Sequence, residues 1–391
     1  DTTPWLAWIA IALGIVSVFI AFFMWWFIGR DDPVVETIEY HAPDGMNCLE
    51  LAFAYKGHAT NQDVIPLLIE LARQGYLSIS CENKKGTDFS ITLIRSSYEG
   101  TKENERLFFD GLKKIAAGPV IHKSDLKDRF YKTPEAILKT INTPENKTKL
   151  FHSNSLNKGW ILWVLAVVVF GFAYFLPGYQ YSYDWLEVGF GLMSIGVFGV
   201  SIYMLCADTR QKLSLLIGAF LLLLSIGLSY LFVWIPVTYA DRFYQLACIV
   251  SYIICAILVF FSAFLTKRTP YGTEILGRIR GFKRFLETAE KERLEMLVEE
   301  NPDYFYEILP YTYVLNVSDK WVKNFKSIAC EPPSWYTNDN DSYFDIIAFK
   351  HIMNSTIASA SNSLTSSPES ASSSGGGFSG GGSGGGGGGA W

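Results

Sequence analysis

Five unbroken apolar stretches constrain this chain more than any other feature. They occupy residues 5–28, 160–176, 185–205, 213–236 and 243–265. A helix needs about 20 predominantly apolar residues to cross about 30 Å of hydrocarbon, and none of these stretches has a charged residue near its middle. A globular core is about as apolar, but it does not gather its apolar residues into such runs. The sequence therefore predicts an α-helical integral membrane protein with five transmembrane helices.

The positions of Lys and Arg predict the orientation of these helices, because basic residues accumulate in cytoplasmic loops. One side of the five-span arrangement carries nearly all of them near the helix ends, namely Arg30, Lys158, Arg210, Lys212, Lys267 and Arg268. In the loops on the other side, Arg242 is the only basic residue. We therefore expect a multi-pass protein of the cell membrane with its amino terminus outside and its carboxyl terminus in the cytoplasm. The chain starts at Asp1 without a basic n-region, so we expect a processed product or fragment whose first stretch is a span.

The stretches divide the chain into five regions. We expect the first transmembrane helix at 1–29, a cytoplasmic domain at 30–159 and a four-helix transmembrane bundle at 160–265. A cytoplasmic amphipathic and aromatic helical region follows at 266–354. The Ser/Gly-rich tail at 355–391 is predicted to be disordered, because its composition cannot bury enough apolar area to order it.

The block 30–159 has the order of elements of a winged helix. Pro43-Asp44-Gly45 predicts a turn before a short helix, and Asn61 is expected to cap a second helix that ends at Gly75. The runs 77–80 and 89–93 are strand-like and flank a polar tip. We therefore expect a winged-helix-like α+β domain, followed by a helical unit with helices at 102–115, 125–131 (capped by Ser124) and 134–149.

DNA binding by this domain is not favoured. The helix in the recognition position offers Glu70 and Arg73 but no basic cluster, and only Lys84 and Lys85 lie at the wing tip. Non-specific affinity grows with the number of phosphate contacts, and the net charge of the chain is −5. We expect protein partners for this domain rather than nucleic acid.

The segment 266–301 is predicted to be a basic amphipathic helix directly after a span. Such a helix can lie on anionic lipid headgroups, and the residues expected to contact them are Arg278, Arg280, Lys283 and Arg284. The alternative, equally favoured by the sequence, is a helix that packs on the cytoplasmic block.

Small residues form stripes on the later spans, where they allow close approach of helix backbones. The expected packing residues are Gly189, Gly196, Gly199, Ser214, Gly218, Ser225, Ser229 and Ser251. They predict a packed bundle, an oligomer, or both.

No recognisable catalytic motif occurs in the sequence. There is no Walker loop, no His-Glu-x-x-His and no paired Cys-x-x-Cys, and the five histidines are scattered. Gly377-Phe378-Ser379-Gly380-Gly381 fits a nucleophile elbow only because any Gly/Ser tract does. We therefore predict no catalytic residue, no metal site and no cofactor, and a protein that is not an enzyme.

Several blocks of sequence together resemble the YciQ-like family of predicted bacterial membrane proteins, a domain-of-unknown-function family. They are His41-Ala42-Pro43-Asp44-Gly45, Leu71-Ala72-Arg73-Gln74-Gly75-Tyr76-Leu77, Gly281-Phe282-Lys283-Arg284-Phe285-Leu286-Glu287-Thr288-Ala289-Glu290-Lys291, Leu309-Pro310-Tyr311 and Ser318-Asp319-Lys320-Trp321, with the Gly-rich end. The resemblance implies an extracytoplasmic domain before the first span, which we expect to be missing from this chain, and it implies no active site. Pro66 and Asn316 depart from the family pattern; Pro66 is expected to shift the start of its helix, and Asn316 to adopt the left-handed conformation that usually favours Gly.

Three functions remain open on the sequence alone. The first is a non-enzymatic membrane scaffold or sensor that links an external domain to cytoplasmic interaction modules. The second is a transporter or channel component with an uncharged path lined by Ser225, Ser229 and Ser251. The third is a membrane-tethered DNA-binding regulator.

Overall fold

The chain folds into two units that alternate along the sequence. A computed structural model describes residues 5–81, 88–156, 158–180, 185–206, 212–230, 242–326, 328, 331–338 and 346–365, apart from some side chains within its helices. Unit 1 comprises Asp1–Pro33 and Phe151–Pro270, and unit 2 comprises Val34–Leu150 and Tyr271–Trp391. The two polar regions that the sequence separates, 30–159 and 266–354, therefore contribute to one unit.

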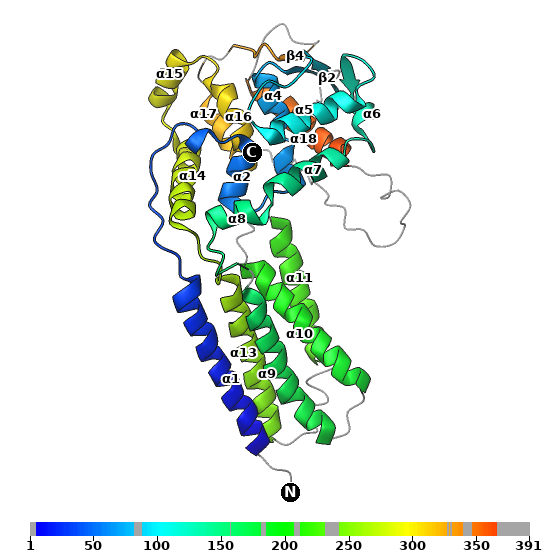
Figure 1. The fold of residues 1–391 in the computed structure, drawn as a ribbon, viewed down its shortest axis with the longest axis vertical. Coiled ribbons are helices and arrows are strands. Elements are labelled where there is room, and N and C mark those ends of the chain that lie inside the picture. Colours follow the sequence, from blue (N-terminus) through cyan, green and yellow to red (C-terminus); the bar gives the residue numbers. More distant parts are fainter. Residues whose placement is uncertain are drawn as a thin grey trace, which may run out of the picture. The chain divides into compact units, whose positions relative to one another are not determined.

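Unit 1 consists of the apolar helices. They are α1 (Trp5–Met24), which continues as the π-helical turn Trp25–Gly29, α9 (Gly159–Gln180), α10 (Trp185–Cys206), α11 (Lys212–Ser229) and α13 (Arg242–Ala263). Each corresponds to one of the five predicted stretches. Within this unit α1, α9 and α13 lie side by side, and α10 lies beside α11 (Figure 1).

Two of these helices are long and apolar enough to cross a bilayer over their described residues, Trp8–Gly29 and Gln245–Ala263. The apolar parts described in α9, α10 and α11 are shorter, at Gly159–Ala173, Met193–Ile202 and Ile217–Ser229. The structure thus supports an apolar helical unit without confirming five membrane-spanning helices.

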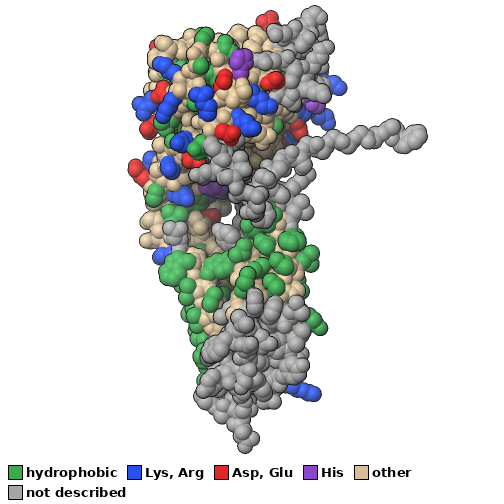
Figure 2. All heavy atoms as spheres, turned by 90° about the vertical axis from the view of Figure 1, so that its right-hand side faces the viewer, with side chains coloured by type: hydrophobic (Ala, Val, Ile, Leu, Met, Phe, Trp, Pro, Cys, Tyr) green, Lys and Arg blue, Asp and Glu red, His purple; other side chains and the backbone are tan. Residues whose placement is uncertain are grey.

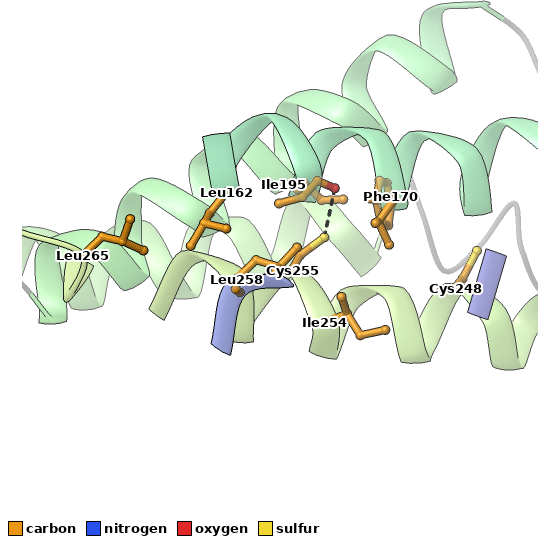
Figure 3. Close-up of a cluster of buried hydrophobic side chains, with 11 residues drawn as sticks. Leu162, Phe170, Ile195, Cys248, Ile254, Cys255, Leu258 and Leu265 are labelled. Carbon is orange, nitrogen blue, oxygen red and sulfur yellow. Dashed lines mark hydrogen bonds between the residues drawn. The ribbon is translucent and has the colours of Figure 1, made fainter. Parts of the chain in front are cut away.

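Apolar side chains cover both the inside and the outside of unit 1. Leu162, Phe170, Cys255 and Leu258 belong to a buried cluster between α9 and α13, in which the Cys255 thiol donates to the Ala166 carbonyl oxygen at 3.2 Å (Figure 3). Large apolar side chains also point outward, and Phe27 and Leu223 are 75% and 70% exposed. The face drawn in Figure 2 shows hydrophobic side chains gathered on the described part of this unit. An exposed apolar surface of this kind is typical of a region that contacts a membrane or another protein.

Unit 2 is built from short helices and one sheet. Its amino-terminal segment contains the 3-10 turn Pro43–Gly45, α2 (Cys48–Lys56), α3 (Asn61–Val64), α4 (Leu67–Arg73), β1 (Leu77–Cys81), β2 (Phe89–Leu93), α5 (Glu103–Ile115), β3 (Val120–His122), α6 (Lys123–Leu126), α7 (Lys132–Ile141) and α8 (Pro144–Leu150). Its carboxyl-terminal segment contains α14 (Pro270–Thr288, beginning at the last residue of unit 1), α15 (Lys291–Glu300), α16 (Tyr304–Val314), α17 (Ser318–Asn324), β4 (Tyr336–Asn338) and α18 (Ile346–Thr365).

The sheet joins the two segments of unit 2. Its strand order is β3-β2-β1-β4, with β1 antiparallel to β2 and parallel to β4. The order helix, helix, hairpin is present, but the hairpin is the middle of a four-stranded sheet, so the winged-helix assignment stays a prediction. The region after the hairpin was expected to be entirely helical, and β3 corrects that expectation. Its three residues are too few for a period-2 pattern to reveal them.

Several helix boundaries differ from the sequence expectations. Thr60, rather than Asn61, is the N-cap, because Thr60 and Asp63 form a capping box. Ser124 lies inside α6, whose N-cap is His122. Pro66 separates α3 from α4, which confirms the expected shift of that helix. The expected helix at 134–149 is two helices, α7 and α8, and the second begins at Pro144.

The carboxyl-terminal region confirms one expectation and corrects another. Asn316 has a φ of 57°, which confirms the left-handed conformation expected at the end of its helix. The predicted disordered tail begins too early at residue 355, because α18 continues to Thr365. The Gly-rich remainder, like the wing-tip residues Lys84 and Lys85, lies outside the described residues.

Candidate functional site

The basic helix α14 packs within unit 2 against the extended segment 34–40. A Cβ added to Gly277 or Gly281 would overlap the carbonyl oxygen of Val35 or Thr37, so these glycines allow helix and chain to touch. Their Gly-x-x-x-Gly spacing, which permits such a close approach, is the signal in the sequence that could have revealed this contact. The sequence left two interpretations of this helix open, contact with lipid headgroups and packing on the cytoplasmic block. The structure shows direct contacts for the second.

The four residues expected to contact lipid lie on α14 with different surroundings. Arg278 donates from Nε to Glu39 at 2.9 Å and from Nη1 to Asp44 at 2.6 Å. These two carboxylates raise its pKa, although burial acts in the opposite direction.

The remaining three basic residues of that set have fewer charged neighbours. Arg284 lies 3.2 Å from Glu36, and Lys283 lies 3.4 Å from the Tyr55 hydroxyl. Arg280 is partly exposed. Lipid contact by these residues stays a prediction.

The small residues expected to pack the apolar helices also differ among themselves. A Cβ added to Gly199 would reach the Trp163 ring, and one added to Gly218 would lie 3.2 Å from Leu205, whereas Gly189 and Gly196 have nothing within 4 Å. The side chain of Ser214 lies outside the described part of α11.

The three remaining serines are buried. Ser229 lies 3.3 Å from the Ser194 hydroxyl and 2.7 Å from that of Tyr252. Ser225 donates to the Leu222 carbonyl of its own helix, and the Ser251 hydroxyl has no partner among the described residues.

A polar cavity of about 450 Å³ is the candidate binding site of unit 2. We call it the signature cleft, because its lining includes residues of three blocks that carry the family resemblance: His41, Ala42 and Gly45 from the first, Arg73 and Gln74 from the second, and Tyr311 from Leu309-Pro310-Tyr311. The other lining residues are Met46, Asn47, Glu70, Tyr98, Gly100, Thr101, Lys102, Glu105, Glu307 and Ile308. The cavity is not evident from the sequence, because wall residues such as Met46 and Tyr311 are 265 positions apart.

Local structure holds each wall of the signature cleft in place. Asn47 caps α2 through a capping box with Glu50, which fixes the segment that runs from His41. Gly75, with a φ of 75°, ends the helix that carries Glu70 and Arg73.

The wall formed by α16 is tied to the amino-terminal segment by two tyrosines. Tyr311 donates to the Met46 carbonyl oxygen at 2.9 Å, and Tyr304 donates to that of Tyr40 at 2.5 Å. Burial raises the pKa of both phenols, so they remain donors at neutral pH.

A buried carboxylate, Glu105, organises the floor of the cleft. It is 2% exposed, and it accepts hydrogen bonds from Asn47 at 2.8 Å, Gln74 at 3.1 Å and Tyr98 at 2.8 Å. Burial and the bond to Glu105 raise the pKa of the Tyr98 phenol, which therefore stays protonated. Both oxygens of Glu105 are thus satisfied by the protein itself.

A second buried carboxylate, Glu70, is only half satisfied. Its Oε1 accepts from Arg73 Nη2 at 2.9 Å, while its Oε2 and the Nε of Arg73 have no hydrogen-bond partner among the described residues. Burial raises the pKa of the Glu70 carboxyl, opposed by Arg73 and assisted by Glu105. Because a buried polar atom without a partner costs free energy, this pair is the most unusual feature of the cleft.

The remaining polar groups lie in more open parts of the cleft. Lys102 is neutralised by Glu50 at 2.5 Å. Glu307 lies 3.5 Å from His41 Nδ1 and accepts from Asn301 at 2.9 Å, with about a third of its side chain exposed. The arrangement offers carboxylate oxygens and aromatic rings to a ligand.

No nucleophile or metal centre is evident in the described part of unit 2. The buried Cys48 thiol has a pKa well above its ordinary value, because burial and the nearby Glu70 and Glu105 disfavour the thiolate. No group of three or more His, Cys, Asp or Glu side chains that could hold a metal ion occurs among the described residues. Chemistry by a thiolate or a bound metal has no support from these side chains.

Comparisons with known proteins identify the family and nothing finer. No curated protein and no solved structure matches the chain. The family described as "Predicted membrane protein (DUF2207) C-terminal domain" matches residues 37–212 and 206–325, which together cover most of the chain. These matches include the first residues of the signature cleft, all of the later apolar helices and α16. The chain belongs to this family of predicted membrane proteins of unknown function.

Proposed function

We propose that this chain is a multi-pass membrane protein with five spans that acts as a non-enzymatic scaffold or sensor, with its amino terminus outside and unit 2 in the cytoplasm. The single observation that carries the proposed topology is the parallel pairing of β1 with β4. These strands come from the two polar segments on either side of residues 151–270, so both segments belong to one folded unit.

This pairing limits the number of membrane crossings between the two segments. Because one soluble unit cannot lie on both sides of a bilayer, the chain between its two segments must cross an even number of times. If α13 were the only crossing there, the segments would be separated. Four crossings, by α9, α10, α11 and α13, satisfy the condition, and a further crossing by α1 places the amino terminus on the other side.

Helix lengths agree with this count. The 22 residues of α9, α10 and α13 each span about 33 Å at about 1.5 Å per residue. The 18 residues of α11 span about 27 Å. Each therefore approximates the hydrocarbon thickness of a bilayer, which is about 30 Å.

Contacts within unit 1 bring together the helix ends that lie near basic residues. His152 donates its N–H to the Lys267 carbonyl oxygen at 2.9 Å, and the Arg268 N–H donates to Asp31 at 2.6 Å. The end of α1, the beginning of α9 and the end of α13 are thereby joined. Basic residues at this end support a cytoplasmic position.

The scaffold or sensor role rests on the absence of support for its rivals in the described residues. In the channel alternative, Ser225, Ser229 and Ser251 would line a path. The hydroxyls of the first two bond a backbone carbonyl and other side chains, and only that of Ser251 has no partner among the described residues. In the DNA alternative, α4 would enter a groove, but six of its seven residues are buried and Arg73 is paired with Glu70. The YciQ-like affiliation and an extracytoplasmic domain upstream of α1 belong to the same proposal.

Cysteine labelling in intact and permeabilised cells tests the topology. Ser97→Cys and Glu292→Cys place exposed thiols on the two segments of unit 2, and Thr3→Cys reports on the amino terminus. A membrane-impermeant maleimide should label Thr3→Cys in intact cells, and the other two only after permeabilisation, above the background of the unsubstituted chain. Labelling of Ser97→Cys and Glu292→Cys from opposite sides would refute the proposal.

A further inference from the structure

We propose that the signature cleft binds an organic cation with N–H donors, an ammonium or guanidinium group. The inference deepens the sensor role and rests on it for its biological setting. The cleft itself lies wholly within unit 2, so binding is tested independently of the number of spans. Its volume of about 450 Å³ lies within the range of about 300–1,000 Å³ that is usual for small-molecule sites.

The charge of the lining favours a cation. Three carboxylates line the cleft, Glu70, Glu105 and Glu307, against the side chains of Arg73 and Lys102 and the imidazole of His41. Lys102 is already neutralised by Glu50, which lies outside the lining. One guanidinium therefore faces three carboxylates, and a bound anion would meet a net repulsion.

Hydrogen-bonding capacity identifies which carboxylates are available. Glu105 uses both oxygens on Asn47, Gln74 and Tyr98. Glu70 keeps Oε2 without a partner among the described residues, in a side chain that is 2% exposed. Glu307 accepts from Asn301 at 2.9 Å and lies 3.5 Å from His41, but about a third of its side chain is exposed, so a ligand can approach its oxygens. A small shift of the surrounding side chains would let a ligand N–H group donate to the buried Oε2 of Glu70. Glu307 would accept from a second N–H group of the ligand at a more exposed position.

Two further features fit the same ligand. Tyr98 and Tyr311 line the cleft, and aromatic side chains attract ammonium and guanidinium groups. The Arg73 Nε, which also has no partner among the described residues, can donate to a carbonyl oxygen on the same ligand. A purely structural Arg73–Glu70 pair would gain more from two parallel hydrogen bonds, which are frequent in such pairs.

Binding is tested by calorimetry on the full chain in detergent or nanodiscs. The probes are Nα-acetylarginine amide and spermidine. Nα-acetylcitrulline amide, which carries a neutral urea group in place of the guanidinium group, is the uncharged control. We expect saturable binding of at least one cation and none of the citrulline compound. Binding of the arginine compound alone indicates a basic segment of a partner protein as the source, and binding of spermidine alone indicates a free polyamine. Both results support the site.

Variants locate the binding within the cleft. Glu70→Gln and Glu307→Gln should each raise Kd by about tenfold, the loss of one charged hydrogen bond. Glu103→Gln, on an exposed residue of the same unit that does not line the cleft, should leave Kd unchanged. If Glu70→Gln fails to fold, the more exposed Glu307→Gln still decides. Absence of saturable binding by both cations, equal binding of the citrulline compound, or unchanged Kd in both cleft variants overturns the proposal.

Discussion

The hydroxyl groups of Ser80 and Thr337 lie 2.6 Å apart across the parallel pairing of β1 with β4. These residues are 257 positions apart in the sequence, with α9, α10, α11 and α13 between them. A polar unit closed in this way requires its two segments to reach the same compartment. The pairing is therefore both a folding contact and a constraint on membrane topology.

Replacing Gly281 by Ala should destabilise unit 2. The added Cβ would overlap the carbonyl oxygen of Thr37, which belongs to the backbone and cannot rotate away as a side chain can. Overpacking of this kind costs about 1–3 kcal/mol, and the better helix propensity of Ala returns up to about 1 kcal/mol. A lower apparent Tm is expected in thermal unfolding. Gly118→Ala, where nothing lies within 4 Å of the new Cβ, serves as the control, and equal Tm values for the two variants would contradict the prediction.

The Ser229 and Tyr252 hydroxyls should be coupled energetically within the apolar helices. They lie 2.7 Å apart, and Ser229 also bonds Ser194 across to α10. A double-mutant cycle with Ser229→Ala and Tyr252→Phe should give a coupling energy of about 0.6 kcal/mol, the average for such interhelical bonds. The control is Ser201→Ala, since Ser201 bonds only the Phe198 carbonyl of its own helix in the described contacts. Strict additivity of the two substitutions in detergent unfolding would show that this bond contributes nothing.

Asn316 should tolerate Gly far better than Val. Its φ of 57° lies in the left-handed region, which a β-branched residue adopts only with strain. Asn316→Val should lower the free energy of unfolding by about 1–3 kcal/mol, whereas Asn316→Gly should change it little. Chemical denaturation of the two variants compares them directly. A Val variant as stable as the Gly variant would show that the end of α16 relaxes to another conformation.

The stability of unit 2 should fall as the pH rises above 4.5 because of Glu70. Burial, followed by the nearby Glu105, raises its pKa in the folded state above the ordinary 4.5, despite the opposing Arg73. At pH values between 4.5 and the raised pKa of folded Glu70, the folded state binds more protons than the unfolded chain. The free energy of unfolding therefore decreases as the pH rises through this range. The Cys48 thiol and the Tyr311 phenol also face Glu70, but their raised pKa values keep them neutral there.

Glu70→Gln removes this titration. The Tm of the variant, relative to that of the unsubstituted chain, should therefore increase from pH 4.5 upward. Parallel Tm profiles for the two proteins would show that the Glu70 carboxyl titrates alike in the folded and unfolded states.

The sequence by itself determined the apolar helices. Runs such as 5–28 and 243–265 can bury their side chains only in an apolar surrounding, whatever the rest of the chain does. Local signals also predicted the left-handed Asn316 and the helix that ends at Gly75, because these features depend on a few neighbouring residues. The helix boundary at Thr60 was missed by one residue, since Thr and Asn are both good caps.

Only the tertiary structure decided which distant segments meet. The addition of β4 to β1, and the contact of Gly277 and Gly281 with segment 34–40, depend on complementarity between surfaces that no periodicity records. The signature cleft has the same origin: Glu70 and Tyr311 each appear in the sequence as ordinary helix residues. Packing of α4 against α16 buries Glu70 and leaves one of its oxygens without a partner among the described residues. A pattern of residue types in the sequence does not show which side-chain atoms become buried in this way.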